Sequence, residues 1–268
     1  MKNVLLLVHD DSGQEARFQA ALDLCRALGG HLTCLDVAYV PPVMGSGYYD
    51  NAYAVAEIVK DQTARELVNR QKLEARLSHE DVPWEWIDAC GDFARCLKRS
   101  SELADVIVVD RQLGNFAYPN MQGVASELVV RSGKPVLAVP SDCPRLALEA
   151  AMVAWDGSAC AAVAMRAAVP LLRCTDEVVI IEVDDGSVTA PAEHAAQYLS
   201  RHDIRADVRR IKASSGGAGK VLLDEACGGA FSYAVLGGYG HLRLLESLFG
   251  GVTRTMLSRC PIPVFLAH

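Results

Sequence analysis

The stretch VLLLVHDDSGQEARFQAALDLCRALGGHLTCLDVAYV, residues 4–40, decides the fold because the chain repeats its pattern. Residues 151–186, AMVAWDGSACAAVAMRAAVPLLRCTDEVVIIEVDDG, have the same order: an apolar strand, an acidic turn with a serine, an alanine- and leucine-rich helix and a second apolar strand. Short apolar strands that alternate with helices are typical of a parallel sheet covered by helices. The sequence therefore predicts two copies of one α/β unit.

The two copies also match further along the chain. Both continue with a helix that leads into a strand, over residues 91–110 and 216–238, and both close on a helix and a strand, VASELVVRSGKPVLAVP (124–140) and VTRTMLSRCPIPVFLAH (252–268). We expect domains at 1–142 and 149–268, joined by a linker near residues 141–149. Right-handed crossovers make each domain doubly wound, with a five-stranded parallel sheet of order 3-2-1-4-5. The closing strands KPVLAVP and IPVFLAH are expected to pack together as an intramolecular pseudo-dimer.

The second copy predicts the elements most clearly. Its strands are expected at Ala151–Trp155, Glu177–Val183, Arg205–Ile211, Tyr233–Gly237 and Val264–Ala267. Its helices are expected at Ala159–Leu172, Pro191–His202, Gly217–Ala226 and Ser247–Arg259. The first copy is longer, and PPVMGSGYYDNAYAVAEIVK (41–60) accounts for the excess as a loop and an extra helix after the second strand.

Composition narrows the class of protein. Of 268 residues, 51% are hydrophobic and 22% charged, which is typical of a well-packed chain. The net charge of −7 argues against nonspecific binding to nucleic acid or anionic membranes. No apolar run approaches the ~20 residues of a membrane span, and MKNVLLLVHDD is typical of a first strand rather than a signal peptide. These features predict a cytoplasmic protein with no membrane and no nucleic-acid partner.

Cysteine and histidine give no support for a metal site. The nine cysteines are scattered and form no CxxC, and the seven histidines form no HxxxH or HExxH. Most cysteines have apolar neighbours, so we expect buried free thiols in a reducing compartment.

Two glycine-rich turns are candidates for a ligand site. Ligands in doubly wound sheets bind beyond the carboxyl ends of the strands, between strands 1 and 4. In the second copy this crevice would be built from WDGS (155–158), LGGYG (236–240) and FGGVT (249–253). Gly237 and Gly240 would allow close approach to a ligand, and Gly250 and Gly251 would open backbone amides toward phosphates. The alternative is that these glycines only form turns.

The third glycine-rich stretch, SSGGAGK (214–220), is a weaker candidate. A phosphate-binding loop of the GxxxxGK[ST] type needs a glycine where this chain has Ser214 and a hydroxyl where it has Val221. It also follows the third strand rather than the first. We interpret it as a polar loop that caps a helix. No GxGxxG motif follows either first strand.

The arrangement resembles the universal stress protein (UspA-like) family in its tandem two-domain form, over nearly the whole chain. The most specific element is the family motif Gly-x2-Gly-x9-Gly-[Ser/Thr], matched in spacing by Gly237, Gly240 and Gly250. VAWDGS and CPIPVFLAH match the opening and closing strands. The resemblance implies an α/β module, often dimeric, that binds ATP, with or without Mg²⁺, and acts in stress response.

The resemblance also implies site residues in the second copy. Asp156 holds the place of the nucleoside-contacting aspartate, and Val183 that of the strand-2 backbone contact to adenine. The loop positions that would contact phosphate and ribose are Leu236, Gly237, Gly240, Gly250, Gly251 and Val252. The motif's hydroxyl position is Gly251, so one donor to phosphate is lost, and Thr253 could substitute for it. Arg243 and Arg254 are nearby cations.

The first copy departs further from the family. Asp110, Arg111 and Gln112 stand where glycines would be, and Gln122 and Gly123 stand at the start of the next helix. Because an acidic side chain repels polyphosphate, we predict that the first copy does not bind ATP in the family manner. Its turn keeps Asp10, matched to Asp156, with Asp11 and Ser12. The insert with Tyr48, Tyr49 and Tyr53 either closes over a different ligand or caps the domain.

Three functions remain open from sequence. The first is a nucleotide-responsive regulatory protein, the second a slow ATPase or other nucleotide-using enzyme, and the third a scaffold whose nucleotide site has decayed. No Ser/His/Asp set or carboxylate pair indicates catalysis, and His241 is interpreted as a surface residue. The expected partner is an adenine nucleotide, and pairing of two chains into a homodimer stays open.

Overall fold

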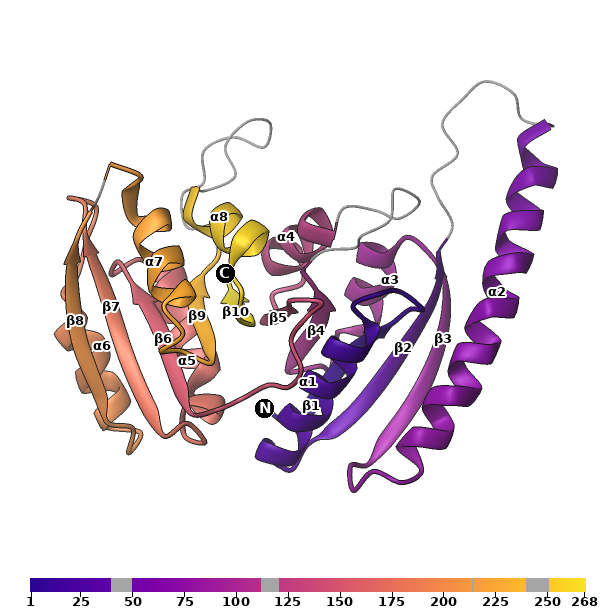
Figure 1. The fold of residues 1–268 in the computed structure, drawn as a ribbon, viewed down its shortest axis with the longest axis horizontal. Coiled ribbons are helices and arrows are strands. Elements are labelled where there is room, and N and C mark those ends of the chain that lie inside the picture. The colour runs from indigo at the N-terminus through magenta and orange to yellow at the C-terminus, as the bar shows by residue number, and fades with distance from the viewer. Residues whose placement is uncertain (40–49, 112–120, 214, 240–250) are drawn as a thin grey trace.

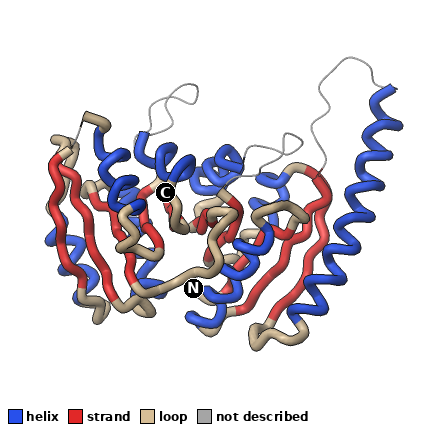
Figure 2. Tube along the Cα trace, in the orientation of Figure 1, coloured by secondary structure: helices blue, strands red, loops and turns tan. Residues whose placement is uncertain are grey.

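One continuous sheet runs through the molecule. The computed structural model describes residues 1–39, 50–111, 121–213, 215–239 and 251–268. Its ten strands lie in the order β3-β2-β1-β4-β5-β10-β9-β6-β7-β8, with helices on both faces (Figures 1 and 2). Each half of the sheet therefore has the order 3-2-1-4-5, as the repeat predicts.

The N-terminal half supplies five parallel strands. They are β1 (Asn3–Val8), β2 (His31–Tyr39), β3 (Trp84–Gly91), β4 (Val106–Asp110) and β5 (Val136–Val139). Its helices are α1 (Gln14–Leu28), α2 (Asp50–Leu77), α3 (Phe93–Ser100) and α4 (Met121–Arg131). Burial in β1 is nearly continuous, which is why this strand reads as an apolar run and lies inside the sheet.

The C-terminal half repeats this order close to the predicted bounds. Its strands are β6 (Ala150–Trp155), β7 (Glu177–Asp184), β8 (Ala206–Lys212), β9 (Tyr233–Gly237) and β10 (Val264–Ala267). Its helices are α5 (Ala159–Leu172), α6 (Ala192–Ser200), α7 (Gly217–Cys227) and α8 (Gly251–Arg259). Residues 247–250 of the predicted last helix lie outside the described part of the chain.

The closing strands join the two halves. β5 and β10 pair antiparallel, with Val264 opposite Ala138, so the predicted pseudo-dimer packing is confirmed. The hydroxyl groups of Tyr239 and Ser126 also hydrogen-bond across the junction. Since β4, β5, β10 and β9 are hydrogen-bonded to one another in that order, the two halves share a single sheet.

In the described part of the insert after β2, a helix is lengthened and none is added. α2 has 28 residues, whereas its counterpart α6 has nine. A parallel crossover already needs one helix between its strands, so the inserted residues extend that helix. The predicted extra helix is thus corrected to one long α2 (Figure 1). Tyr48 and Tyr49 lie outside the described residues, and Tyr53 lies within α2.

All nine cysteines are free, but the prediction that most are buried is wrong. Cys25, Cys34, Cys96 and Cys260 are buried, while the other five are partly or fully exposed. Cys227, the last residue of α7, shows why: an apolar run in the sequence can end at a helix terminus that faces water.

No helix among the described residues combines the length and apolar character needed to cross a bilayer.

Candidate functional site

The turn after β6 has a fixed shape. The Asp156 carboxylate accepts the backbone N–H of Ser158 at 2.8 Å, and the Ser158 hydroxyl accepts that of Ala161 at 3.1 Å, which caps α5. Gly157 has φ +77°, and a Cβ there would lie 2.1 Å from the nitrogen of Ala190. Only glycine fits this position, so the turn that presents Asp156 depends on it.

The segment after β7 lies directly against this turn. The backbone N–H of Thr189 donates to the Asp156 carbonyl at 2.8 Å, and the Trp155 indole donates to the Ala190 carbonyl at 2.8 Å. The Val183 side chain is buried, and its carbonyl accepts the N–H of Asp185 at 3.1 Å. The loop that follows Val183 is therefore held beside Asp156.

Gly237 ends β9 and makes a close approach, although its neighbour is protein. A Cβ on Gly237 would lie 2.5 Å from the nitrogen of Ala161 in the first turn of α5. Leu236, the residue before it, is 1% exposed and belongs to the core. The absence of a side chain at Gly237 thus lets β9 and the α5 N-terminus meet.

The start of α8 is open. Gly251 is exposed, and a Cβ there would meet nothing within 4 Å in the described structure. Val252 packs against Gly219 of α7, since a Cβ on Gly219 would lie 3.2 Å from its Cα. The hydroxyl of Thr253, 4% exposed, accepts the Tyr239 N–H at 3.4 Å. Thr253 is thus tied to the loop backbone.

The predicted site residues Gly240 and Gly250 fall outside the described residues, as do Arg243, His241 and Gln112, which the sequence analysis also discussed. Arg254, in the first turn of α8, is described and exposed. The SSGGAGK stretch starts α7, with Gly216 at the N-cap, which confirms the interpretation as a helix start. Within it, the Lys220 ammonium pairs with Asp224 at 2.5 Å on the same helix.

His268 and Cys160 were missed from sequence. The Nδ1 atom of His268 lies 2.8 Å from the Gly238 carbonyl and 3.4 Å from the Cys160 sulfur. A carbonyl only accepts, so Nδ1 carries the proton and donates. Burial raises the pKa of the Cys160 thiol, with Asp156 adding to the effect. The pairing of β9 with β10 brings His268, the residue after β10, beside Gly238. The predicted pairing of these two strands, continued by one residue, could have placed His268 at the site.

The matching crevice of the N-terminal half is filled by its own side chains. Asp110 is 1% exposed, and a Cβ on Gly13 would lie 2.0 Å from its Oδ2 atom. Arg17 is fully buried, donates to both Asp11 oxygens at 2.7 and 2.6 Å, and lies 3.8 Å from Asp110. Asp110 thus stands at the α1 N-terminus, where the C-terminal half has the bare backbone of Gly237. Protein carboxylates thus lie at the α1 N-terminus, where negative charge suits the helix dipole.

The match of Asp10 with Asp156 is wrong by one residue. The strand register aligns Val8 with Trp155, so His9 holds the position of Asp156. Its turn is longer because the N-terminal half needs two more residues before α1 begins. The His9 imidazole is 1% exposed and contacts Glu66 through Nδ1 at 2.7 Å. A buried imidazole thus replaces the carboxylate expected to contact a nucleoside.

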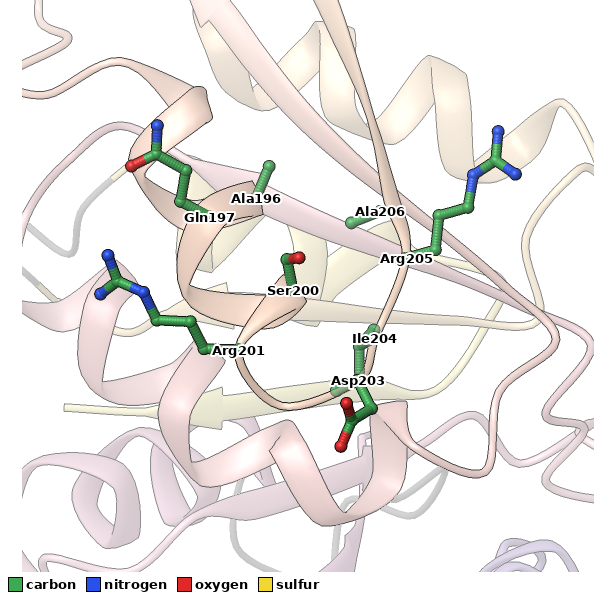
Figure 3. A pocket seen from close by; sticks show the side chains of 8 residues that line it. All are labelled: Ala196, Gln197, Ser200, Arg201, Asp203, Ile204, Arg205 and Ala206. Carbon is green, nitrogen blue, oxygen red and sulfur yellow. The ribbon is translucent and has the colours of Figure 1, made fainter.

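The described residues contain no group of three or more His, Cys, Asp or Glu arranged to hold a metal ion. A surface cavity of about 830 Å³ lies between the end of α6 and the start of β8 (Figure 3). Arg201 and Arg205 flank it on opposite sides (Figure 3), and none of the predicted site residues lines it. It lies at the opposite end of β8 from the strand ends that form the candidate site.

Comparison with known proteins finds similar structures but no similar sequences. No protein-family model matches the chain, and a search of curated proteins finds no match. A universal stress protein from Archaeoglobus fulgidus has a similar structure, with 19% identity and TM-score 0.74 over 100% of this chain and 98% of that one. A putative universal stress protein from Pseudomonas aeruginosa gives 14% identity and TM-score 0.63, covering 99% and 93%.

A third structure, of a functionally unknown protein from Pseudomonas aeruginosa, gives 13% identity and TM-score 0.64, covering 99% of this chain and 92% of that one. The chain therefore has the universal stress protein fold along its full length. The resemblance stated from sequence is confirmed at the level of the fold.

Proposed function

We propose that this chain is a tandem universal stress protein that binds an adenine nucleotide in its C-terminal half and changes its interactions in response. The observation that carries the proposal is the contrast between the two crevices. One is filled by Asp110 and Arg17, whereas the other keeps Gly237 at the strand end and an open Gly251 at the α8 N-terminus. Helix N-termini with free backbone amides favour phosphate.

The assigned roles follow the sequence expectation. Asp156 accepts from the ribose, the backbone of Val183 faces adenine, and the loop from Leu236 through Gly240 to Gly250, Gly251, Val252 and Thr253 takes the phosphates, with Mg²⁺ as counter-ion. The segment that holds the Thr189 N–H against the Asp156 carbonyl supports a nucleoside position here, because it fixes the backbone that carries the carboxylate. We favour a regulatory role because the motif that this crevice carries is one for binding; the His268 imidazole, beside Gly238 and Cys160, is the described side chain that a catalytic role would need.

Gly251→Asp tests the proposal with a matched control. Its side chain enters open space, and aspartate suits a helix N-terminus, so folding is expected to persist. The carboxylate would repel phosphate, and we expect at least about a tenfold loss of ATP affinity by calorimetry with Mg²⁺. Gly123→Asp is the control, because Gly123 holds the equivalent place in α4 and is also open.

The outcomes separate the functions. Binding of about one ATP per chain, lost in Gly251→Asp and kept in Gly123→Asp, supports the proposal. Equal loss in both variants, or none in either, contradicts it. No binding at millimolar nucleotide supports the scaffold alternative, and steady release of phosphate that stops with Gly251→Asp supports the slow ATPase.

A further inference from the structure

A second cavity, of about 460 Å³, lies in the N-terminal half between α2 and the ends of β2 and β3. This volume is within the range of small-ligand pockets. Ala38, Leu67 and Ala89 give it apolar walls, and the acidic groups that line it are Asp36, Glu66 and Asp88. The cavity shares no residue with the candidate nucleotide site.

The equivalent position in the C-terminal half has an arginine that this cavity lacks. Strand register places Asp36 where β7 has Glu182, and Asp88 where β8 has Arg210. Glu182 is satisfied, since it accepts the Ala192 N–H at 2.7 Å and the Arg210 guanidinium at 2.8 Å. In the cavity an acid replaces that arginine, so the buried carboxyl group faces another acid across the strand pair.

Among the described residues, no cation pairs directly with Asp36, and Arg70 acts on it only at a distance. It is 5% exposed, and its buried Oδ1 atom receives no hydrogen bond from the described residues. Its carboxyl group hydrogen-bonds Glu66 on α2, which is 4% exposed, and two carboxyl groups share such a bond only when one holds a proton. Burial, then Glu66 and Asp88, raises the pKa of Asp36 to about 8.

The nearby basic groups are already engaged. The Arg70 guanidinium on α2 donates to Glu74 at 2.8 Å and to Asp88 at 2.7 Å. The His9 imidazole contacts the far side of Glu66 at 2.7 Å. Among the described residues, Asp36 thus faces two carboxyl groups, Glu66 and Asp88, and one guanidinium, Arg70, that already has acidic partners, which is costly for a buried site.

We propose that this cavity binds an organic ammonium ion, a primary amine with an apolar body, whose charge takes the place that Arg210 holds in the other half. The ammonium group donates to Asp36 and Glu66, and the proton they share leaves to solvent. The apolar walls cover the body of the ligand. A metal ion fits less well, because no described cluster offers three suitable ligands.

Titration of the full chain with 2-phenylethylamine, followed by backbone amide NMR at pH 8.5, tests the proposal. We expect saturable shifts at residues 36–38 and 88–90, and none with the uncharged analogue 2-phenylethanol. Affinity should fall about tenfold per pH unit below pH 8, because the amine competes with the shared proton. Asp36→Asn should weaken binding at least about tenfold.

Asp88→Arg is the sharper variant. Asp88 is exposed, so folding should persist although its ion pair with Arg70 is lost, and the new arginine copies Arg210 and should abolish amine binding. Asp207→Asn, an exposed acid on β8, is the matched control and should bind amine normally. Equal binding in Asp36→Asn, equal binding of the alcohol, no saturable shift, or displacement by stoichiometric Mg²⁺ would each overturn the proposal.

Discussion

The contact between Gly13 and Asp110 makes a quantitative prediction about the closed crevice. In Gly13→Ala, the new Cβ would lie 2.0 Å from Oδ2 and 2.6 Å from Cγ of Asp110. Asp110 is 1% exposed, so its carboxylate has no solvent to move into. Overpacking of this kind costs about 1–3 kcal/mol, and alanine is a poorer N-cap than glycine. We expect a loss of about 2–4 kcal/mol.

The assay is thermal and urea unfolding followed by circular dichroism, with a double-mutant cycle. A loss of this size lowers the melting temperature of a chain this long by roughly 2–4 °C per kcal/mol. In an Asp110→Gly background the clash is gone, so Gly13→Ala should cost at least about 1 kcal/mol less there. Gly123→Ala is the control, because its Cβ meets nothing and it should stabilise α4 by about 0.5–1 kcal/mol.

The reasoning is refuted if Gly13→Ala stays within about 0.5 kcal/mol of the parent, or if its cost is the same in both backgrounds.

Three further predictions concern charged groups and the open helix start. Arg17→Met should destabilise the chain by about 3–5 kcal/mol in urea unfolding, since it leaves Asp11 and Asp110 without their buried cation; a loss under about 1 kcal/mol would contradict this. Because the pKa of Asp36 is raised to about 8, the folded state keeps the carboxyl proton at pH values where the unfolded state has lost it. The free energy of unfolding should therefore decrease as the pH rises from about 4 to 8, by up to about 1.4 kcal/mol per pH unit. Asp36→Asn should remove that slope from melting curves, and an unchanged slope would assign it to other groups. Gly251→Ser should tighten ATP binding about tenfold in calorimetry by restoring a hydroxyl donor, and unchanged affinity would place the phosphates elsewhere.

The fold could be predicted because its signals are local and occur twice. Apolar runs such as residues 151–155 and 177–183 are flanked by turns and helices, and the repeat removed the ambiguity of any single run. Right-handed crossovers then gave a doubly wound sheet, for which the order 3-2-1-4-5 was taken. The antiparallel junction was also predictable, since KPVLAVP and IPVFLAH are the only elements left to close each half.

The candidate site was less predictable because its decisive contacts join distant residues. Asp10 was matched with Asp156 by residue type, whereas the turn lengths differ and the sheet register assigns His9 to that place. The packing of Gly13 against Asp110 and of Gly237 against Ala161 joins a strand end to a helix start far away in sequence. A glycine in the sequence does not say which neighbour needs the space.

The antiparallel pairing of β5 with β10 has a consequence for how the two halves could evolve. In a symmetric assembly of identical subunits, every substitution appears in both copies at once. Here the two halves of the junction are encoded separately, so Asp110 could enter one crevice without entering the other. The same pairing occupies the closing-strand edges, so that β3 and β8 are the edges of the sheet that the described residues form. A tandem chain of this kind lets its two halves specialise while remaining in fixed one-to-one stoichiometry.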